Sequence, residues 1–265
     1  MAYWILLLLC FVIYLLPCLP IKNLQGDAKG RITNVLVFFG LLFHAGLIYQ
    51  TTFLAGIDLN FANGLLITSW IGVLLYLLIN ASDQHKGFEY LTLVPALFFL
   101  IINPFMSGHN YLKEIFSPLS ILHIVFALLG YSLLAFGALF SIFLLYVEKN
   151  VRSKKLNTKI FSSNTPILSL ENFLFRIYWL GFILLTITLI SGSLFSDEIF
   201  QTALIINHKL IFSICAWFIY AILLLGRILF GWRGKKAIVF SLIAFVLLFT
   251  SYLGSKFVLE VIIGV

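Results

Sequence analysis

Charged residues are scarce in this sequence. Only 10% of its 265 residues are Asp, Glu, Lys or Arg, whereas soluble domains carry about 25%, so a soluble globular domain is not expected. Every acidic residue falls in a loop or at the end of an apolar run. No paired carboxylates and no Ser/His/Asp set can therefore gather within one part of the apolar region, and we expect no enzyme activity.

Cysteine is also rare, with three residues, Cys10, Cys18 and Cys215, that form no C-x-x-C pair. All three lie within apolar runs, where a cysteine behaves as a small hydrophobic side chain. This pattern excludes a thiol–disulfide transfer function.

Long apolar runs are abundant instead. Hydrophobic residues make up 62% of the chain, and repeated apolar runs of about 18 or more residues are typical of membrane-spanning helices. We expect an all-α, polytopic membrane helix bundle with eight transmembrane helices, forming a single transmembrane domain over residues 1–265. The predicted spans are Ala2–Leu19, Ile32–Leu54, Phe61–Ala81, Phe88–Ile102, Leu119–Val147, Phe173–Phe195, Ala203–Leu229 and Ala237–Leu253.

The net charge of +7 comes from basic residues concentrated in the odd-numbered loops. Such an asymmetry follows from the positive-inside rule and does not indicate a nucleic-acid partner. It predicts that the odd loops are cytoplasmic and that both termini lie outside. The largest polar stretch, residues 148–172, is then a basic cytoplasmic loop beside the lipid bilayer.

Three histidines fall within the predicted spans, where an ionisable side chain is costly and suggests a function. At 1.5 Å per residue, His123 lies about 6 Å and His208 about 7 Å inside the outward ends of the fifth and seventh spans. Imidazoles at matched depth on two helices are suited to axial ligation of a heme iron. The alternative is that each histidine only hydrogen-bonds a neighbouring helix. His44 lies deeper in the second span, where it is a packing or relay group or a further ligand.

Two aromatic residues accompany these histidines. Tyr131 lies eight residues after His123, within about 80° of the same helix face, and we expect it to line the same cavity. Trp217 lies in the middle of the span Ala203–Leu229, which also contains His208. Both are candidate cofactor-binding residues.

A set of short motifs follows in order between His123 and Glu260: His123 with Tyr131, Gly181-Phe182, Leu185-Thr186, Ser191-Gly192, Lys209 to Trp217, Gly231-Trp232-Arg233-Gly234 and Tyr252-Leu253-Gly254. In this order the motifs resemble the cytochrome c assembly membrane proteins, the CcsA- and CcmC-like family. The length and the eight-span layout are most similar to its shorter YpjD- and HemX-like branch. The first four spans match this family in hydropathy and layout alone.

The resemblance implies a multi-pass protein of the bacterial inner (cytoplasmic) membrane that binds or handles heme b in cytochrome c-type biogenesis. The family's outward histidine corresponds to His123, while His208 stands where a proline is usual and could supply a second ligand. The tryptophan-rich heme loop of the CcsA-type members is absent, because residues 195–207 contain no tryptophan, and residues 252–265 contain no outer histidine.

Two other functions remain open. The chain could be a non-heme accessory or scaffold protein that acts through a membrane or periplasmic protein partner. It could also be a small-solute transporter with His44 as its site, although no buried carboxylate and no broken helix supports that function.

Overall fold

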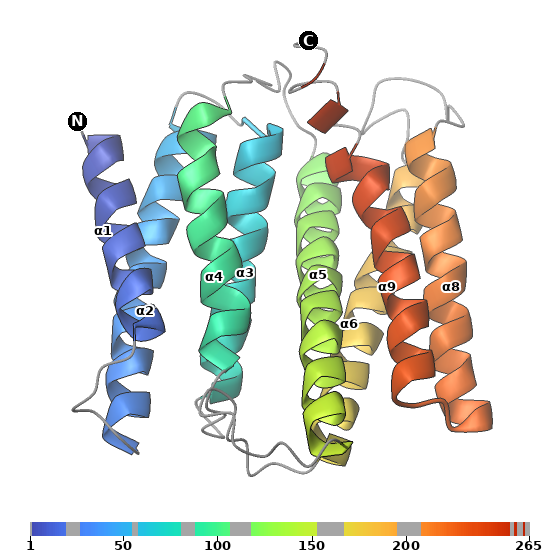
Figure 1. Ribbon diagram of the computed structural model, residues 1–265. Coiled ribbons are helices and arrows are strands. Elements are labelled where there is room, and N and C mark those ends of the chain that lie inside the picture. The colour runs from blue at the N-terminus through green and yellow to red at the C-terminus, as the bar shows by residue number, and fades with distance from the viewer. Residues whose placement is uncertain are drawn as a thin grey trace. The chain divides into compact units, whose positions relative to one another are not determined.

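The computed structural model describes residues 2–19, 27–54, 58–80, 88–106, 118–152, 167–194, 208–254, 257–258 and 262. Every element along these residues is a helix (Figure 1). In the apolar region each backbone N–H and C=O must find its partner within the chain, and a helix satisfies them within one segment. Each of the eight predicted spans overlaps one α-helix.

The helices group into two compact units. Unit 1 holds α1 (Ala2–Cys18), α2 (Asp27–Ile48), α3 (Phe61–Asn80) and α4 (Phe88–Ile102), with the π-helical turn η1 (Tyr49–Phe53) after α2 and the short 3₁₀ turn η2 (Asn103–Phe105) after α4. Helix α1 packs against α2 and α4, and α3 packs against the same two helices. Unit 1 is therefore a ring of four helices.

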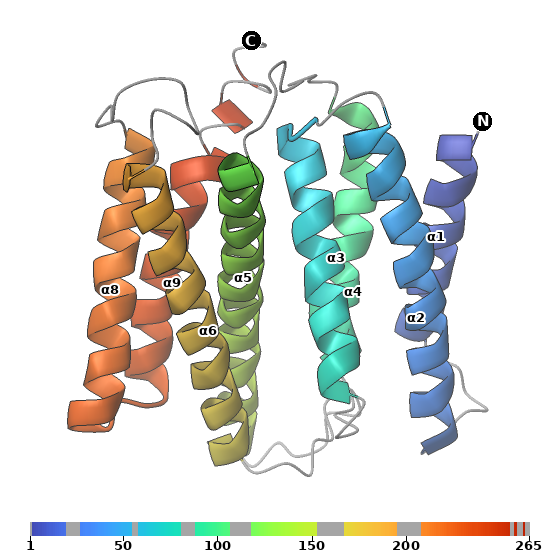
Figure 2. The ribbon, with the colours of Figure 1, turned by 180° about the vertical axis from the view of Figure 1, so that it is seen from behind.

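Unit 2 repeats this arrangement with α5 (Pro118–Arg152), α6 (Ile167–Leu194), α8 (His208–Phe230) and α9 (Lys235–Phe249), followed by the π-helical turn η3 (Thr250–Gly254). Helices α5 and α8 each pack against both α6 and α9. Figure 2 shows α6 in front of α9 within this unit. Small residues permit the close packing: the face of α5 at Gly137 accommodates the ring of Tyr178 from α6.

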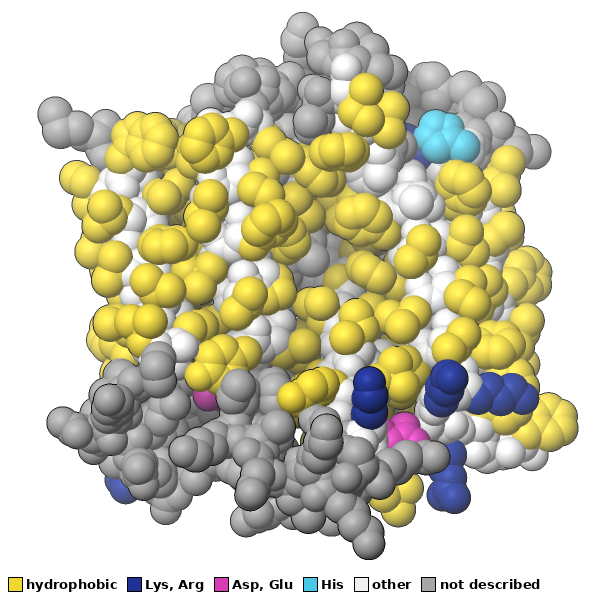
Figure 3. Space-filling model, viewed as in Figure 1, with side chains coloured by type: hydrophobic (Ala, Val, Ile, Leu, Met, Phe, Trp, Pro, Cys, Tyr) yellow, Lys and Arg dark blue, Asp and Glu magenta, His cyan; other side chains and the backbone are white. Residues whose placement is uncertain are grey.

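Six helical segments are long and apolar enough to cross a membrane, namely Gly30–Phe53, Phe61–Leu78, Pro118–Lys149, Ile167–Leu194, His208–Phe230 and Lys235–Gly254. Two further apolar helices, Ala2–Cys18 and Glu89–Phe105, are shorter. Large hydrophobic side chains are exposed along the helices of both units (Figure 3), as expected for surfaces that face lipid.

The polar loop predicted over residues 148–172 needs correction. Helix α5 continues to Arg152 and α6 begins at Ile167, so residues 148–152 and 167–172 are helical. Hydropathy marks where a helix leaves the apolar region and not where its hydrogen bonding stops. The polar residues beyond Val147 therefore extend α5, and Glu171 belongs to the first turns of α6.

Candidate functional site

His123 lies on α5 and faces the end of α6. Its Nδ1 is 2.8 Å from the hydroxyl oxygen of Ser191, and its Cε1 would lie 3.1 Å from a Cβ at position 192, where the chain has glycine. The Ser191 hydroxyl also donates to the carbonyl of Thr188, at 3.1 Å. The single serine proton can be in only one of these two bonds. When it is in the bond to Thr188, the serine oxygen accepts from Nδ1–H of His123 and the lone pair of the imidazole is on Nε2.

His208 is the first residue of α8 and is exposed. Figure 1 shows that α5 and α8 begin at the same end of unit 2, and Figure 3 shows a histidine at the surface there. The half-buried His123 and the exposed His208 thus share one end of the unit. The described contacts of the His123 ring are with α6.

A network of hydroxyl groups joins three helices at this same end. Ser251 of η3 donates to the carbonyl oxygen of Lys209, at 3.0 Å, and hydrogen-bonds the Ser213 hydroxyl at 2.7 Å. Tyr131 donates to the Leu248 carbonyl, at 2.8 Å, with the Ser251 hydroxyl 3.3 Å away. The phenol of Tyr131 therefore ties α5 to the end of α9 and, through Ser251, to α8.

Trp217 connects α8 with α6. Its indole N–H donates to the Thr186 hydroxyl at 2.8 Å, and its ring stacks on Phe182 with 5.4 Å between the centroids. The polar atom of Trp217 thus already has a partner between helices, as does that of Tyr131. These contacts explain why the motif residues around 182–186 and 217 occur together.

His44 is fully buried in unit 1. Its Nδ1 lies 3.3 Å from the Tyr14 hydroxyl of α1, while its Nε2 has no hydrogen-bond partner. A buried polar atom that lacks a partner is costly. Among the residues that the structure describes, His44 is thus a buried histidine with one unsatisfied nitrogen.

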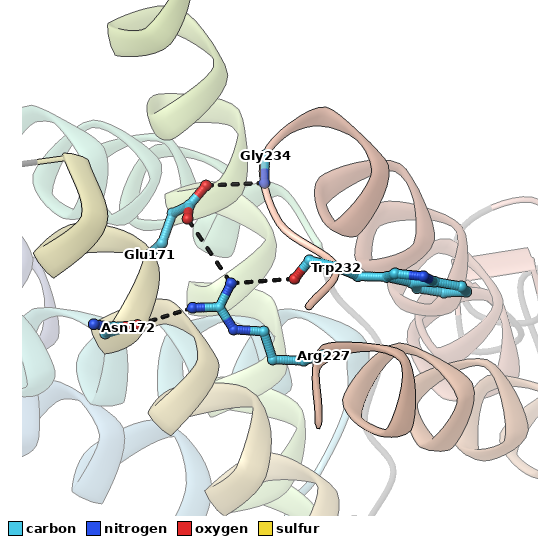
Figure 4. A network of polar contacts seen from close by, with 5 residues as sticks. All are labelled: Glu171, Asn172, Arg227, Trp232 and Gly234. Carbon is cyan, nitrogen blue, oxygen red and sulfur yellow. Dashed lines mark hydrogen bonds and ion pairs between the residues drawn. The ribbon is translucent and has the colours of Figure 1, made fainter. Parts of the chain in front are cut away.

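The Gly231-Trp232-Arg233-Gly234 segment forms the turn between α8 and α9, at the opposite end of unit 2 in Figure 1. Figure 4 shows its polar contacts from close by. Glu171 of α6 accepts the Gly234 N–H at 2.9 Å and lies 4.0 Å from the Arg227 guanidinium. Arg227 in turn donates to the Trp232 carbonyl at 3.2 Å and to Asn172 at 2.9 Å. One carboxylate therefore holds the turn and the end of α8 against α6.

Sequence reasoning did not find several of these residues. The sequence places Ser191 only within the Ser191-Gly192 motif, and Glu171 falls in the predicted loop 148–172. No short-range pattern links either residue to its partner, since Ser191 is 68 positions from His123 and Glu171 is 63 from Gly234. The buried position of Glu171, at 7% exposure, became evident only once α6 was seen to begin at Ile167.

No group of three or more His, Cys, Asp or Glu side chains that could hold a metal ion occurs in the part of the chain that the structure describes. Axial ligation of a heme iron needs only two side chains. The hydroxyl-oriented His123 and the unsatisfied His44 both fit such a role.

Comparison with known proteins finds similar membrane proteins and one matching family. The family model described as Cytochrome C assembly protein matches residues 2–263. The inner membrane protein YpjD of Escherichia coli K12 is 31% identical over 183 residues, which cover 68% of each chain. The cytochrome c biogenesis protein CcsA of Heterosigma akashiwo is 31% identical over 166 residues, 51% of this chain and 52% of that protein. The CcsA protein of Trieres chinensis is 25% identical over 275 residues, 89% of this chain and 85% of that protein. No solved structure matches.

Proposed function

Because the chain belongs to the cytochrome c assembly protein family, we propose that it binds or handles heme during cytochrome c biogenesis. It is a multi-pass protein of the inner membrane, like its YpjD relative. Its CcsA relatives are named as cytochrome c biogenesis proteins. The transfer of that role to this chain depends on whether its own histidines are suited to heme.

The observation that carries the proposal is the state of His123. We propose that Ser191, with its own proton bonded to Thr188, accepts the Nδ1–H and so holds both the orientation of the ring and the tautomer with its lone pair on Nε2. Metal-ligating histidines are commonly fixed in this way by a partner on their other nitrogen. Heme iron offers axial positions that such a nitrogen can occupy.

A second axial ligand is proposed from the remaining histidines of the apolar region. His208 is the first residue of α8, lies at the same end of unit 2 as His123 and is exposed. His44 is buried, with Nδ1 beside Tyr14 and Nε2 unsatisfied. We favour His123 with His208, both of unit 2, as the ligand pair for heme b; His44, of unit 1, is the other histidine of the apolar region that could ligate a heme.

Titration of the purified, detergent-solubilised protein with hemin tests this function. We expect a Soret band of a six-coordinate heme, and we expect His123→Ala to weaken binding by about tenfold or more. His208→Ala and His44→Ala identify the second ligand by which of them removes the six-coordinate spectrum. His85→Ala is the control, since His85 falls in a loop predicted to be cytoplasmic.

A protein that stays colourless with added hemin would overturn the proposal. If the same preparation carried a second membrane or periplasmic protein, and if the three histidine variants left that complex intact, the accessory or scaffold function would replace it.

A further inference from the structure

Among the residues that the structure describes, two buried side-chain atoms of unit 1 have no hydrogen-bond partner. They are Nε2 of His44 on α2 and Oγ1 of Thr52 in the π-helical turn η1. Both side chains are completely covered by protein, with 0% exposure. Because a buried polar atom without a partner is costly, each of these atoms points to a small polar ligand.

The two side chains belong to one continuous helical segment, since η1 follows α2 directly. Eight residues separate them, which would place them about 80° apart around a regular α-helix and about 12 Å apart along its axis. The last four of these steps run through η1. A π-helix closes its hydrogen bonds over five residues instead of four, so each residue rotates by less and the offset becomes smaller. His44 and Thr52 therefore share one side of the segment, and that side is buried.

The other nitrogen of His44 is held by Tyr14 of α1. The phenol oxygen lies 3.3 Å from Nδ1, and the ring of Tyr14 fits against α2 at Gly40, where a Cβ would collide with it. Tyr14 is itself fully buried, and within the described part of the chain its hydroxyl bonds only His44. If this hydroxyl accepted from Nδ1–H, its own proton would be buried without an acceptor. Both groups are satisfied when Tyr14 donates to Nδ1, and the imidazole proton is then on Nε2.

Thr52 lies in polar surroundings at the end of the segment. Its carbonyl accepts the N–H of Asp58 at 2.8 Å. The side-chain amide of Asn63 donates to the Thr51 carbonyl at 3.1 Å and to the Asp58 carbonyl at 2.9 Å. The Thr51 hydroxyl bonds the Leu47 carbonyl at 3.1 Å, the usual bond of a threonine within a helix. Since the Thr52 hydroxyl does not make such a bond, it can bond a ligand.

The chemistry of the two atoms selects the ligand. Nε2–H of His44 needs an acceptor, and the Thr52 hydroxyl can donate or accept. An ion in an apolar interior is far more costly than a neutral molecule. Water is neutral, both donates and accepts, and occupies only about 30 Å³. A larger ligand needs an opening, whereas both atoms are completely covered.

From these observations we propose that the interior of unit 1 binds a file of ordered water along the side of α2 and η1 that carries His44 and Thr52. The first water accepts from Nε2–H of His44, and the last bonds the Thr52 hydroxyl. At about 2.8 Å between hydrogen-bonded oxygens, about three waters span the distance. The file lets the Nε2 proton exchange with water at the end of unit 1 where α3 begins. Each exchange replaces that proton by one from water and leaves the charge of the protein unchanged.

The same tautomer bears on the choice of heme ligands. A ligating imidazole nitrogen needs its lone pair, and the bond from Tyr14 places a proton on Nε2 of His44. Tyr14 therefore favours His208 over His44 as the partner of His123. The water file itself does not depend on heme binding.

NMR of the full-length protein in lipid bilayers, with nitrogen-labelled histidine and tryptophan side chains, tests the proposal. The signals of His44, assigned by their loss in His44→Gln, should show a protonated Nε2 and an Nδ1 that accepts a hydrogen bond. After transfer to deuterium oxide, we expect the His44 Nε2–H to exchange at least about tenfold faster than the indole N–H of Trp70. Trp70 is the reference in the same unit, because its N–H donates to the Leu41 carbonyl at 3.0 Å and must open before it exchanges.

Two neighbouring threonines supply matched variants. Thr52→Val keeps the shape of the side chain and removes the hydroxyl that holds the last water, so we expect exchange at His44 to slow by about tenfold. Thr51→Val is the control and should leave this exchange unchanged, because the Thr51 hydroxyl already bonds the Leu47 carbonyl. Tyr14→Phe removes the donor to Nδ1 and should give a mixture of the two imidazole tautomers.

Exchange at His44 as slow as at Trp70 would overturn the proposal, and so would equal effects of the two threonine variants. A wild-type imidazole with its proton on Nδ1 would also overturn it, because the first water needs the Nε2–H. If Thr52→Val does not fold, magnetisation transfer from water to His44 Nε2 in the wild type decides, and its absence would overturn the file. Hemin titration of Thr52→Val, which we expect to match the wild type, separates this inference from heme binding.

Discussion

At the scale of single residues, the hydroxyl of Ser191 sets the chemical state of His123. In the tautomer proposed above it donates to Thr188 and accepts from Nδ1, so the imidazole carries its proton on the side facing α6. A histidine on an apolar helix would otherwise be free to take either tautomer and several ring orientations.

Replacement of Ser191 tests this role without touching a proposed ligand. In Ser191→Ala we expect hemin affinity to fall by about 10- to 100-fold, the usual effect of removing a partner that orients a metal ligand, as measured by Soret titration. Ser193→Ala is the matched control on the same helix, because Ser193 is exposed and bonds only the Ile190 carbonyl among the described contacts. An equal effect of both changes would contradict the orienting role.

Gly226 is required by the close approach of Trp232. A Cβ at position 226 would lie 2.4 Å from Cε3 of the indole, and that ring also receives the Lys236 ammonium at 3.8 Å from its centroid. We expect Gly226→Ala to lower the free energy of unfolding by about 1–3 kcal/mol, the cost of overpacking.

Gly72→Ala provides the comparison, because nothing lies within 4 Å of its Cβ position. There the gain in helix propensity, about 1 kcal/mol, is expected to raise stability. Both changes are measured by thermal unfolding in the same detergent, and a stabilised Gly226→Ala protein would show that the indole moves without cost.

At the scale of elements, Glu171 joins three helices through one carboxylate. It lies on α6, accepts the N–H of Gly234 before α9 and neutralises Arg227 at the end of α8. Gly234 has a backbone φ of 60°, a conformation that fits glycine and strains other residues. The turn thus depends on a glycine for its shape and on α6 for its position.

We expect Glu171→Ala to destabilise the protein by about 1–3 kcal/mol, because it leaves the Gly234 N–H without its acceptor and a half-buried guanidinium without its carboxylate. Asn172→Ala removes only an exposed bond to the same arginine, and its effect should stay within about 0.5 kcal/mol. Chemical unfolding in detergent measures both free energies. Similar losses for the two variants would show that the carboxylate does not hold the turn.

At the scale of the whole molecule, the open question is how often the chain crosses the membrane. Six helical segments are long enough by themselves, and α1 and α4 are shorter apolar helices. A short helix can still cross the membrane if it tilts little, or if the bilayer becomes thinner around it. The basic residues of the odd loops favour eight crossings.

Reporter fusions test this topology. An alkaline phosphatase domain, active only outside the cytoplasm, is expected to be active when joined after residue 265 and inactive when joined after residue 160. A fluorescent protein that folds only in the cytoplasm should give the reverse pattern. Activity of the phosphatase at both positions would contradict the eight-span arrangement.

Much of the fold was predictable from hydropathy. The bounds of α4 agree with the predicted span Phe88–Ile102, and each other span differs from its helix mainly at the ends. This success has a simple cause: lipid leaves an apolar segment no partner for its backbone except itself. The same reasoning failed at Glu171, because the polar end of a helix outside the apolar region has no hydropathy signal.

The sequence by itself determined that this is a multi-pass membrane protein, which segments are apolar, and which few ionisable side chains lie within them, including His44 and His123. Only the tertiary structure decided their partners, Tyr14 for His44 and Ser191 for His123. The physical reason is the range of the interactions. The free energy of transfer into lipid depends on the residues of one segment alone. A hydrogen bond between side chains 30 or 68 positions apart depends instead on how the helices pack.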